Sequence, residues 1–207
     1  FFAELYGRKI VLIQKGRDNM REEIIKNSVK LFERKGFSET SIQDIVDSIG
    51  VTKGTFYYYY ASKENLLMEI HLRYIDNLLK NQRLILQTIH SFREQLAETV
   101  KLIIHDMKYR VSHGRVHFRE INNLTAEHAK KIKEKREEFR LNVIQIISNG
   151  MQSGEFRKSL HPQMISLAVL GVTNWSYHWF NPDGDISVEE LANRYVDFIL
   201  NGIIASR

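Results

Sequence analysis

The residues best suited to chemistry in this sequence are the hydrogen-bond donors of 52–55 and the four consecutive tyrosines of 57–60. Lys53 and Thr55 offer donors to base edges or phosphates, and Gly54 has no side chain to keep the backbone away from a ligand. Phenolic hydroxyls also donate to phosphate without adding charge. Residues of these types at this spacing suit the binding of a nucleic acid better than the breaking of a covalent bond.

The elements around this run predict a helix-turn-helix. Thr40 and Gln43 match a capping box for a short helix, Gly50 provides a tight turn, and Thr52 can cap a third helix that ends near Tyr59. The inner face of the short helix reads Ile42, Ile45, Val46, Ile49. The second helix of such a motif reads base edges with its first residues, so the spacing predicts DNA recognition at 52–55.

The four tyrosines divide between two roles. Tyr60 lies one helical turn after Phe56, so we expect the pair to share a buried face. Tyr57 is expected to donate to phosphate. For Tyr58 and Tyr59, packing in the core and contact with DNA remain equal alternatives, because a helix of two turns has one buried face that cannot accommodate all of these rings.

Apolar residues recur at helical spacing through the chain without sustained strand-like alternation, which predicts an all-α protein. A first helix is expected at 21–35, ended by Gly36, and a fourth helix runs from Ser62 to near Asn81. Four long helices follow, as in a bundle, at 91–110, 125–149, 162–179 and 187–204. We place a helix-turn-helix domain at 20–66 and a helical domain at 67–207.

Residues 1–19 show no clear period and are expected to form an N-terminal extension. Lys15, Gly16 and Arg17 can be encoded by a purine-rich run like a ribosome-binding site, so we expect Met20 to be the natural start. A chain beginning at Met20 that failed to fold or to bind its target would refute this expectation.

The composition excludes several classes of site. The absence of cysteine removes disulfides, zinc-thiolate sites and cysteine nucleophiles, and no apolar run approaches the roughly 18 residues of a spanning helix. We therefore expect a cytoplasmic protein without a membrane partner. The net charge of +5 is weak evidence for DNA binding, because acidic and basic residues balance one another between Met20 and Leu66.

The segment 50–66 resembles the DNA-binding domain of TetR-family repressors, with Gly-Val-Thr-Lys-Gly-Thr before the aromatic run and Ser-Lys-Glu-Asn-Leu after it. Two departures are Tyr59, where the family often has histidine, and Ala61, where proline or a polar residue is common. The resemblance implies a homodimeric repressor that binds a palindromic double-stranded operator and is released by a small apolar ligand. The candidate DNA contacts are Thr40, Ser41, Thr52, Lys53, Gly54, Thr55, Tyr57, Tyr58, Tyr59, Lys63.

Family members dimerise through their last two helices, which here correspond to 162–180 and 187–204. The stretch 164–172 is apolar nearly all round, so it must be buried against other helices or another subunit. The last helix carries a matching apolar stripe of Leu191, Tyr195, Phe198, Ile199, Gly202. We expect these surfaces to pair across a two-fold axis, with ordinary packing inside one subunit as the alternative.

The aromatic segment 171–184 resembles the branch of fatty-acid-degradation and sterol-degradation repressors, whose effectors are acyl-CoA thioesters. This resemblance implies an acyl tunnel with cations at its mouth. The candidate lining residues are Ile103, Met107, Phe118, Ile121, Phe139, Val143, Trp175, Tyr177, and the candidate phosphate partners are Arg110, Arg115, Arg119. For each of these, plain core packing or a solvated arginine is the alternative.

The remaining patterns favour binding over catalysis. No Gly-rich phosphate loop, G-x-S-x-G elbow or H-E-x-x-H helix is present, so we expect neither catalytic residues nor a cofactor. His113 and His117 share a helix face but lack further metal ligands. The run 179–190 imitates a calcium loop, yet Trp179 cannot coordinate, and a turn with a cap at Ser187 explains it.

The charged run 130–140 has alternating signs, which is typical of a solvated helix face. Two other functions remain open. The chain could be a TetR-like regulator of efflux or another pathway with a different hydrophobic effector, or an architectural or activating DNA-binding protein without a ligand.

Overall fold

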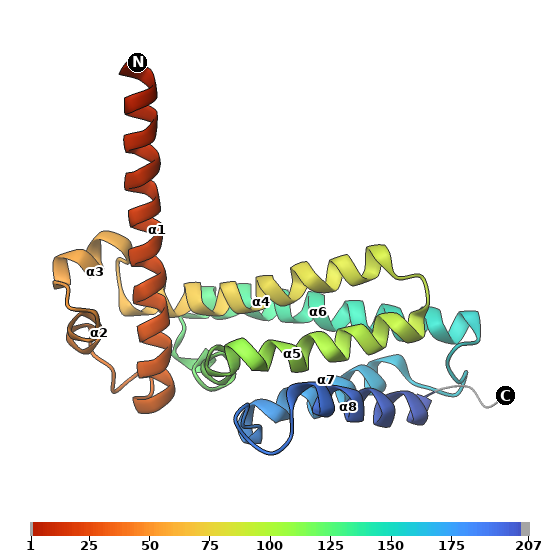
Figure 1. Ribbon diagram of the computed structural model, residues 1–207. Coiled ribbons are helices and arrows are strands. Elements are labelled where there is room, and N and C mark those ends of the chain that lie inside the picture. The colour runs from red at the N-terminus through yellow and green to blue at the C-terminus, as the bar shows by residue number, and fades with distance from the viewer. Residues whose placement is uncertain (1, 204–207) are drawn as a thin grey trace.

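The computed structural model describes the backbone of residues 2–203 and the side chains of 18–203 apart from position 109. The described chain is helical with no strand, which confirms the predicted all-α class. Its elements are α1 (Phe2–Lys35), α2 (Ile42–Ile49), α3 (Lys53–Tyr59), α4 (Lys63–Thr88), α5 (Phe92–Arg119), a 3₁₀ turn η1 (Ile121–Asn123), α6 (Ala126–Ser153), α7 (Pro162–Trp179) and α8 (Val188–Ile203) (Figure 1).

The three N-terminal helices form a unit at one end of the molecule (Figure 1). Phe32 of α1, Ile45 of α2 and Phe56 of α3 are all fully buried in the core of this unit. Gly36, with φ of 88°, ends α1, and Gly50, with φ of 69°, makes the turn between α2 and α3. Both positions lie in the left-handed region that glycine adopts without strain.

The helix expected to begin near Arg21 begins instead at Phe2. The segment before Met20 contains no proline, and its two glycines weaken a helix without ending it. The first half of α1 projects away from the other helices (Figure 1). The expectation that regular structure starts at residue 21 was therefore wrong.

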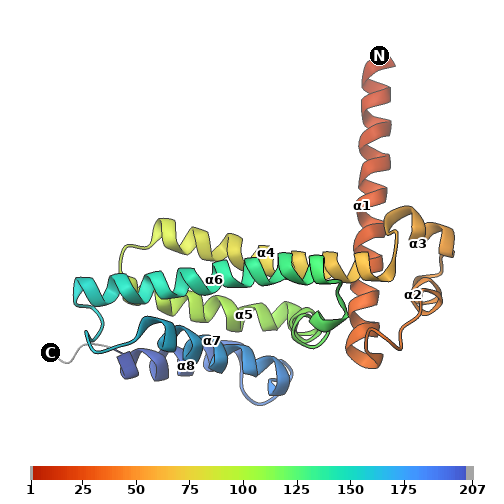
Figure 2. The same cartoon turned by 180° about the vertical axis from the view of Figure 1, so that it is seen from behind.

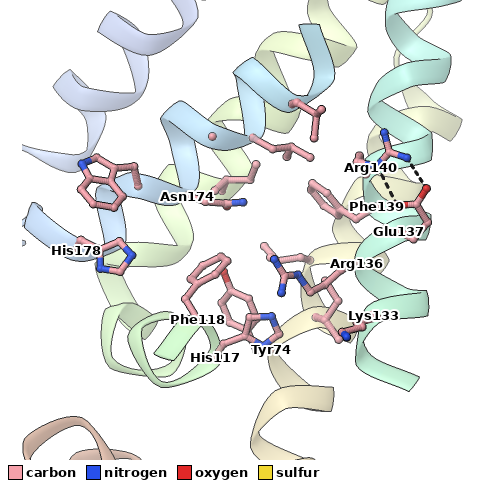
Figure 3. A pocket seen from close by; sticks show the side chains of 17 residues that line it. Tyr74, His117, Phe118, Lys133, Arg136, Glu137, Phe139, Arg140, Asn174 and His178 are labelled. Atoms are coloured by element: carbon pink, nitrogen blue, oxygen red, sulfur yellow. Dashed lines mark hydrogen bonds and ion pairs between the residues drawn. The ribbon is translucent and has the colours of Figure 1, made fainter. Parts of the chain in front are cut away.

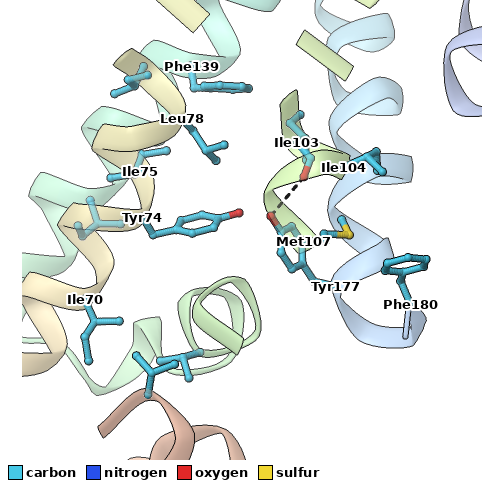
Figure 4. Packing of buried hydrophobic residues seen from close by; sticks show 14 of the residues in the cluster. Ile70, Tyr74, Ile75, Leu78, Ile103, Ile104, Met107, Phe139, Tyr177 and Phe180 are labelled. Atoms are coloured by element: carbon cyan, nitrogen blue, oxygen red, sulfur yellow. Dashed lines mark hydrogen bonds between the residues drawn. The ribbon is translucent and has the colours of Figure 1, made fainter. Parts of the chain in front are cut away.

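The remaining helices form a bundle in which α4 and α6 lie side by side above α7 and α8 (Figure 2). α5 contacts α4, α6, α7 and α8, so it occupies the centre of the bundle. Tyr74 of α4 and Ile103 of α5 meet Tyr177 of α7 in its core (Figure 4). α4 also begins in the N-terminal unit and so connects the two parts of the molecule.

Three predicted helix ends were wrong. α4 continues past Asn81 to Thr88. In the other two cases, a glycine packs closely against a ring inside a helix and does not end it. A Cβ on Gly114 would lie 2.0 Å from the ring of Tyr177, and one on Gly150 would lie 2.3 Å from the ring of Phe156. α5 therefore continues past Arg110 to Arg119, and α6 continues past Asn149 to Ser153. The expected break at Arg110 appears as a kink, with φ of −137° and ψ of 25°.

Within the described residues, no helix is both long enough and apolar enough to cross a membrane.

Candidate nucleic-acid interface and effector cavity

α3 is fixed at both ends by contacts within the protein, and its outer face is exposed. The Oγ1 of Thr52 accepts a hydrogen bond from the backbone N–H of Thr55 at 3.2 Å, which confirms Thr52 as the cap of this helix. At the other end Phe56 and Tyr60 are buried with ring centroids 5.8 Å apart. The predicted core role of Tyr60 is confirmed.

The outer face of α3 carries the predicted recognition residues. Lys53 and Gly54 are exposed, whereas Thr55 is half-buried and shares a 3.2 Å hydrogen bond with the hydroxyl of Thr52. Tyr57 and Tyr58 are 54% and 59% exposed, which is unusual for rings of this size.

Tyr59 is half-buried and packs against the core, with its ring in edge contact with that of Tyr58. Tyr57 and Tyr58 therefore face outward, whereas Tyr59 packs against the core on one side and is partly exposed on the other.

The cap of α2 differs from the prediction. The hydroxyl of Thr40 is buried and donates to the carbonyl of Gly36 at 2.7 Å, so it is not available as a cap. Ser41 caps the helix instead, accepting from the N–H of Asp44 at 3.0 Å while the Asp44 carboxylate accepts from Ser41 N–H at 2.8 Å. That backbone bond, with the nearby Lys35 ammonium, holds the pKa of Asp44 well below its usual range. The predicted capping box of Thr40 and Gln43 was wrong.

Lys63, a candidate phosphate contact, is bonded within the protein. Its ammonium donates to the carbonyls of Phe37 at 2.7 Å and Thr40 at 2.6 Å, and it lies 4.3 Å from the ring centroid of Phe37. Burial lowers the pKa of Lys63 below its ordinary value. Lys63 therefore fixes the loop between α1 and α2, and a contact with phosphate would require these bonds to be exchanged.

A cavity of about 590 Å³ that opens to the surface lies between α4, α5, α6 and α7 (Figure 3). Most of its lining is aliphatic or aromatic, with a few polar and cationic groups. The lining residues are Tyr74, Ile75, Leu78, Ile103, His117, Phe118, Lys133, Arg136, Glu137, Phe139, Arg140, Leu167, Leu170, Gly171, Asn174, Trp175, His178. A cavity of this size and lining suits a small, largely apolar molecule.

Four of the predicted lining residues, Ile103, Phe118, Phe139 and Trp175, line this cavity. The other predicted residues lie elsewhere. Met107, Val143 and Tyr177 are buried in the surrounding core, and Ile121 is partly buried in η1. The Arg110 Nε lies 3.5 Å from the carboxylate of Asp106.

Sequence reasoning missed the cations of the cavity, because the alternating charges of 130–140 indicated a solvated face. Lys133, Arg136 and Arg140 all line the cavity. A signal was present in the spacing: Arg136 falls four residues after Ile132 and three before Phe139, both of which are buried. It therefore lies along the edge of the apolar stripe and reaches the cavity while remaining exposed to solvent.

Two buried histidines lie at the side of the cavity. The Nδ1 atoms of His71 on α4 and His117 on α5 are 2.9 Å apart, so one ring donates to the other. Burial lowers the pKa of His71 to about 4 and lowers that of His117 well below its ordinary value. With His117 bonded to His71, the part of the chain that the structure describes contains no cluster of three potential metal ligands around His113.

The two other arginines predicted as phosphate partners connect the bundle to α1. Arg115 donates to the Glu33 carboxylate at 2.8 Å and to the carbonyls of Tyr177 and Phe180 at 2.9 Å. Arg119 donates to the carbonyls at the end of α1, those of Phe32 and Glu33. The second part of α5 thus joins the wall of the cavity to the N-terminal unit.

The outward face of α7 is apolar. Met164, Leu167, Trp175 and Trp179 are exposed along it, and Phe198 of α8 is exposed as well. The predicted stripe on α8 is divided, because Leu191 and Ile199 are buried within the subunit and the Tyr195 hydroxyl lies 2.9 Å from that of Ser176.

The turn before α8 agrees with its prediction. The Ser187 hydroxyl accepts from the N–H of Glu190 at 3.0 Å, as expected for a helix cap.

Comparison with known proteins follows the same division of the chain. Residues 24–70 match the family model of bacterial regulatory proteins of the tetR family, and residues 90–203 match a tetracyclin repressor-like C-terminal domain. The transcriptional repressor KstR2 of Mycolicibacterium smegmatis is 25% identical and aligns over 90% of this chain and 92% of its own.

Two solved structures share the fold. The ketosteroid transcriptional regulator KstR2 of Mycobacterium tuberculosis superposes with a TM-score of 0.86 at 21% identity, covering 90% of this chain and 96% of its own. AibR, solved in complex with isovaleryl coenzyme A and operator DNA, superposes with a TM-score of 0.77 at 25% identity, covering 86% of this chain and 96% of its own.

Proposed function

This chain belongs to the TetR family of bacterial regulatory proteins, and on that premise we propose that it is a repressor released from its operator by a small apolar effector. The DNA-binding domain spans 20–66 and the effector-binding and dimerisation domain spans 67–207. One observation carries the proposal: the exposed face of α3 and the cavity of the bundle occur in one chain, joined by α4 and by the arginines of α5.

α3 is the recognition helix in this proposal. Lys53 and Thr55 contact base edges or phosphates, and Tyr57 and Tyr58 donate to the DNA backbone. The acidic and basic residues of the DNA-binding domain balance one another. Neutral phenolic donors explain how this domain can still bind DNA. Thr52, Gly54 and Tyr59 complete the contact surface, and Ser41 and Lys63 are positioned beside it.

The protein acts as a homodimer on a palindromic operator. The exposed apolar face of α7, together with Phe198, is too extensive for a monomer's surface and is covered by the partner subunit. Two-fold symmetry then presents two copies of α3, which must lie about 34 to 36 Å apart, or a simple multiple of this distance, to enter successive major grooves.

The effector is a small molecule with a large apolar part, and an acyl-CoA thioester is the favoured class. The size and lining of the cavity support an acyl chain, and AibR, which has the same fold, was solved with isovaleryl coenzyme A. A regulator of efflux or another pathway with a different hydrophobic effector is the second candidate, favoured by the aromatic rings of Tyr74, Phe118 and Trp175 in the lining.

Entry of the effector changes the angle of α4 and spreads the two recognition helices. Spin labels test this step directly, because a chain without cysteine takes a single label pair per dimer at Tyr58→Cys. The distance distribution between the labels should shift when a long-chain acyl-CoA is added. Identical distributions with and without bound acyl-CoA would refute the step.

Operator binding itself is tested by fluorescence anisotropy on the DNA upstream of the protein's own gene. The protein should bind this DNA as a dimer, with an affinity that falls steeply as salt is raised. Binding no tighter than to random DNA would refute an operator at this place.

A further inference from the structure

The cavity has two chemically different ends. α4 and α6 both run away from the DNA-binding unit, whereas α7 runs back toward it (Figure 1). The end nearest α1–α3 is therefore lined by Tyr74, His117, Phe118, Lys133, Arg136 (Figure 3). The far end is lined by Leu78, Ile103, Phe139, Leu167, Leu170 and by Arg140, whose charge is paired with Glu137. An amphipathic molecule would have one preferred direction in such a space.

Among the described side chains, Arg136 and Lys133 of the cavity lining have no ion pair, whereas Arg140 is paired with Glu137. Arg136 is exposed to solvent on one side, and its guanidinium lies 5.6 Å from the ring centroid of Phe118 on the other. Partial burial lowers the pKa of Arg136 below its ordinary value. No carboxylate among the described side chains forms an ion pair with it. A cation in such a place is stabilised when an anion arrives.

The acidic residues near Arg136 on α6 are engaged by other cations. Glu137 pairs with Arg140 at 2.5 Å, and Glu138 pairs with Arg83 at 2.5 Å. The carboxylate of Glu134 lies 3.9 Å from Lys130. Arg136 therefore differs from the paired arginines around it, and Figure 3 shows its side chain turned into the cavity while Arg140 meets Glu137.

We propose that Arg136 binds an anionic group of the effector, a carboxylate or a phosphate, at the end of the cavity nearest the DNA-binding unit. The hydrocarbon part then lies toward Phe139 and Leu170. Lys133 adds a second positive charge at the same end. This assignment deepens the proposed function, because it rests on the cavity being the effector site, and it moves the anion contact from Arg110, Arg115 and Arg119 to Arg136.

The position has a consequence for regulation. The anion is bound beside His117 and Phe118, on the segment of α5 whose Arg115 and Arg119 hold the end of α1. An anion at Arg136 therefore lies beside the same segment of α5 that holds the DNA-binding unit in position.

The test compares three ligands with one twelve-carbon chain: laurate, lauroyl-CoA and uncharged 1-dodecanol. Binding is followed by tryptophan fluorescence, because the chain has two tryptophans and one of them, Trp175, lines the cavity. The wild-type protein should bind at least one of the anionic ligands about 10- to 100-fold more tightly than dodecanol. Arg136→Gln should remove most of this preference and leave dodecanol binding unchanged.

Arg83→Gln is the matched control, since it removes the same charge from an exposed pair on the neighbouring helix and should change none of the three affinities. Arg136→Met retains the apolar stem and gives a second neutral variant if the glutamine variant does not fold. Dependence on Arg136 for laurate assigns a carboxylate, and dependence for lauroyl-CoA alone assigns a phosphate.

Equal losses for dodecanol and the anionic ligands, or an unchanged preference in both variants, would overturn the assignment. Release of DNA is measured separately on the same samples. Binding that depends on Arg136 while the DNA stays bound would support the anion site and refute the proposed effector response.

Discussion

The DNA-binding unit and the effector cavity are built in opposite ways. In the first, the residues that position α3 lie close together in sequence: the Thr52 cap, the Gly50 turn and the Phe56–Tyr60 pair are within one short segment. In the second, the lining comes from four helices, and residues as distant as Tyr74 and His178 meet. The first is a local arrangement and the second depends on packing across the whole bundle.

Their electrostatics differ as well. The recognition surface is largely neutral, with phenolic and hydroxyl donors around Lys53. The cavity places an unpaired cation, Arg136, beside the ring of Phe118. The surface can hold a polyanion by many weak contacts, whereas Arg136 favours a single anionic group. Four substitutions sharpen this contrast.

The largest effect is expected from Phe56→Ala. The ring is fully buried between α3 and the other two helices of its unit, so its removal leaves a cavity that costs about 3 to 5 kcal/mol of unfolding free energy. Urea unfolding followed by circular dichroism measures the loss. Tyr57→Ala is the control, and it should change stability by less than about 0.5 kcal/mol because the ring is exposed. Equal losses for the two would mean that α3 is not anchored as described.

Lys53→Gln should weaken operator binding about 10- to 100-fold, because the ammonium contacts a base edge or phosphate. Anisotropy at fixed salt measures the change. Lys80→Gln removes the same charge from an exposed site on α4 beyond the DNA-binding unit and should leave the affinity within about twofold of the wild type. If both variants bound equally well, overall charge rather than α3 would be the source of affinity.

The cavity side should be the pH-sensitive one, since all the histidines of the chain come after position 66. His71 takes up a proton near pH 6.5 when unfolded but only near pH 4 when folded. Its contribution to stability is therefore complete above pH 6.5 and is lost as the pH falls toward 4, by about 1 to 2 kcal/mol at pH 5.

Urea unfolding of the wild type and of His71→Gln at pH 7.5 and pH 5 checks this expectation. The variant should have the smaller difference in unfolding free energy between the two values. Identical differences would show that His71 is not held neutral by the fold.

The smallest expected effect concerns the connection between the two regions. Glu33→Gln removes the charge that Arg115 contacts from α5. We expect DNA affinity without effector to stay nearly constant and the effector-induced loss of affinity to shrink by about 2- to 30-fold. Glu23→Gln, at an exposed position on α1, is the control. An unchanged effector response in Glu33→Gln would remove this ion pair from the coupling.

The same contrast explains which features could be predicted from the sequence. Thr52, Tyr60 and the fold class were predictable because caps, i to i+4 pairs and apolar periodicity are local signals. The predicted cap of α2 was wrong by one residue. Both Thr40 and Ser41 have a side chain that can cap a helix, and Ser41 is the cap because the hydroxyl of Thr40 is bonded to the carbonyl of Gly36.

The cavity was only partly predictable. Phe139 was predicted on the correct helix, and Phe118 was predicted as a lining residue although it lies beyond the predicted end of its helix. Arg136 was missed because it lies in a run of alternating charge. Arg115 and Arg119 have the expected type of side chain, yet the partners that they contact on α1 lie more than eighty residues away in sequence. No local pattern specifies such contacts.

The most direct test of the central claim is a titration of the complex formed with DNA upstream of this protein's own gene, followed by fluorescence anisotropy. The account predicts that a long-chain acyl-CoA at micromolar concentration releases the DNA while Trp175 reports occupancy of the cavity. Occupancy of the cavity with the DNA still bound would contradict it.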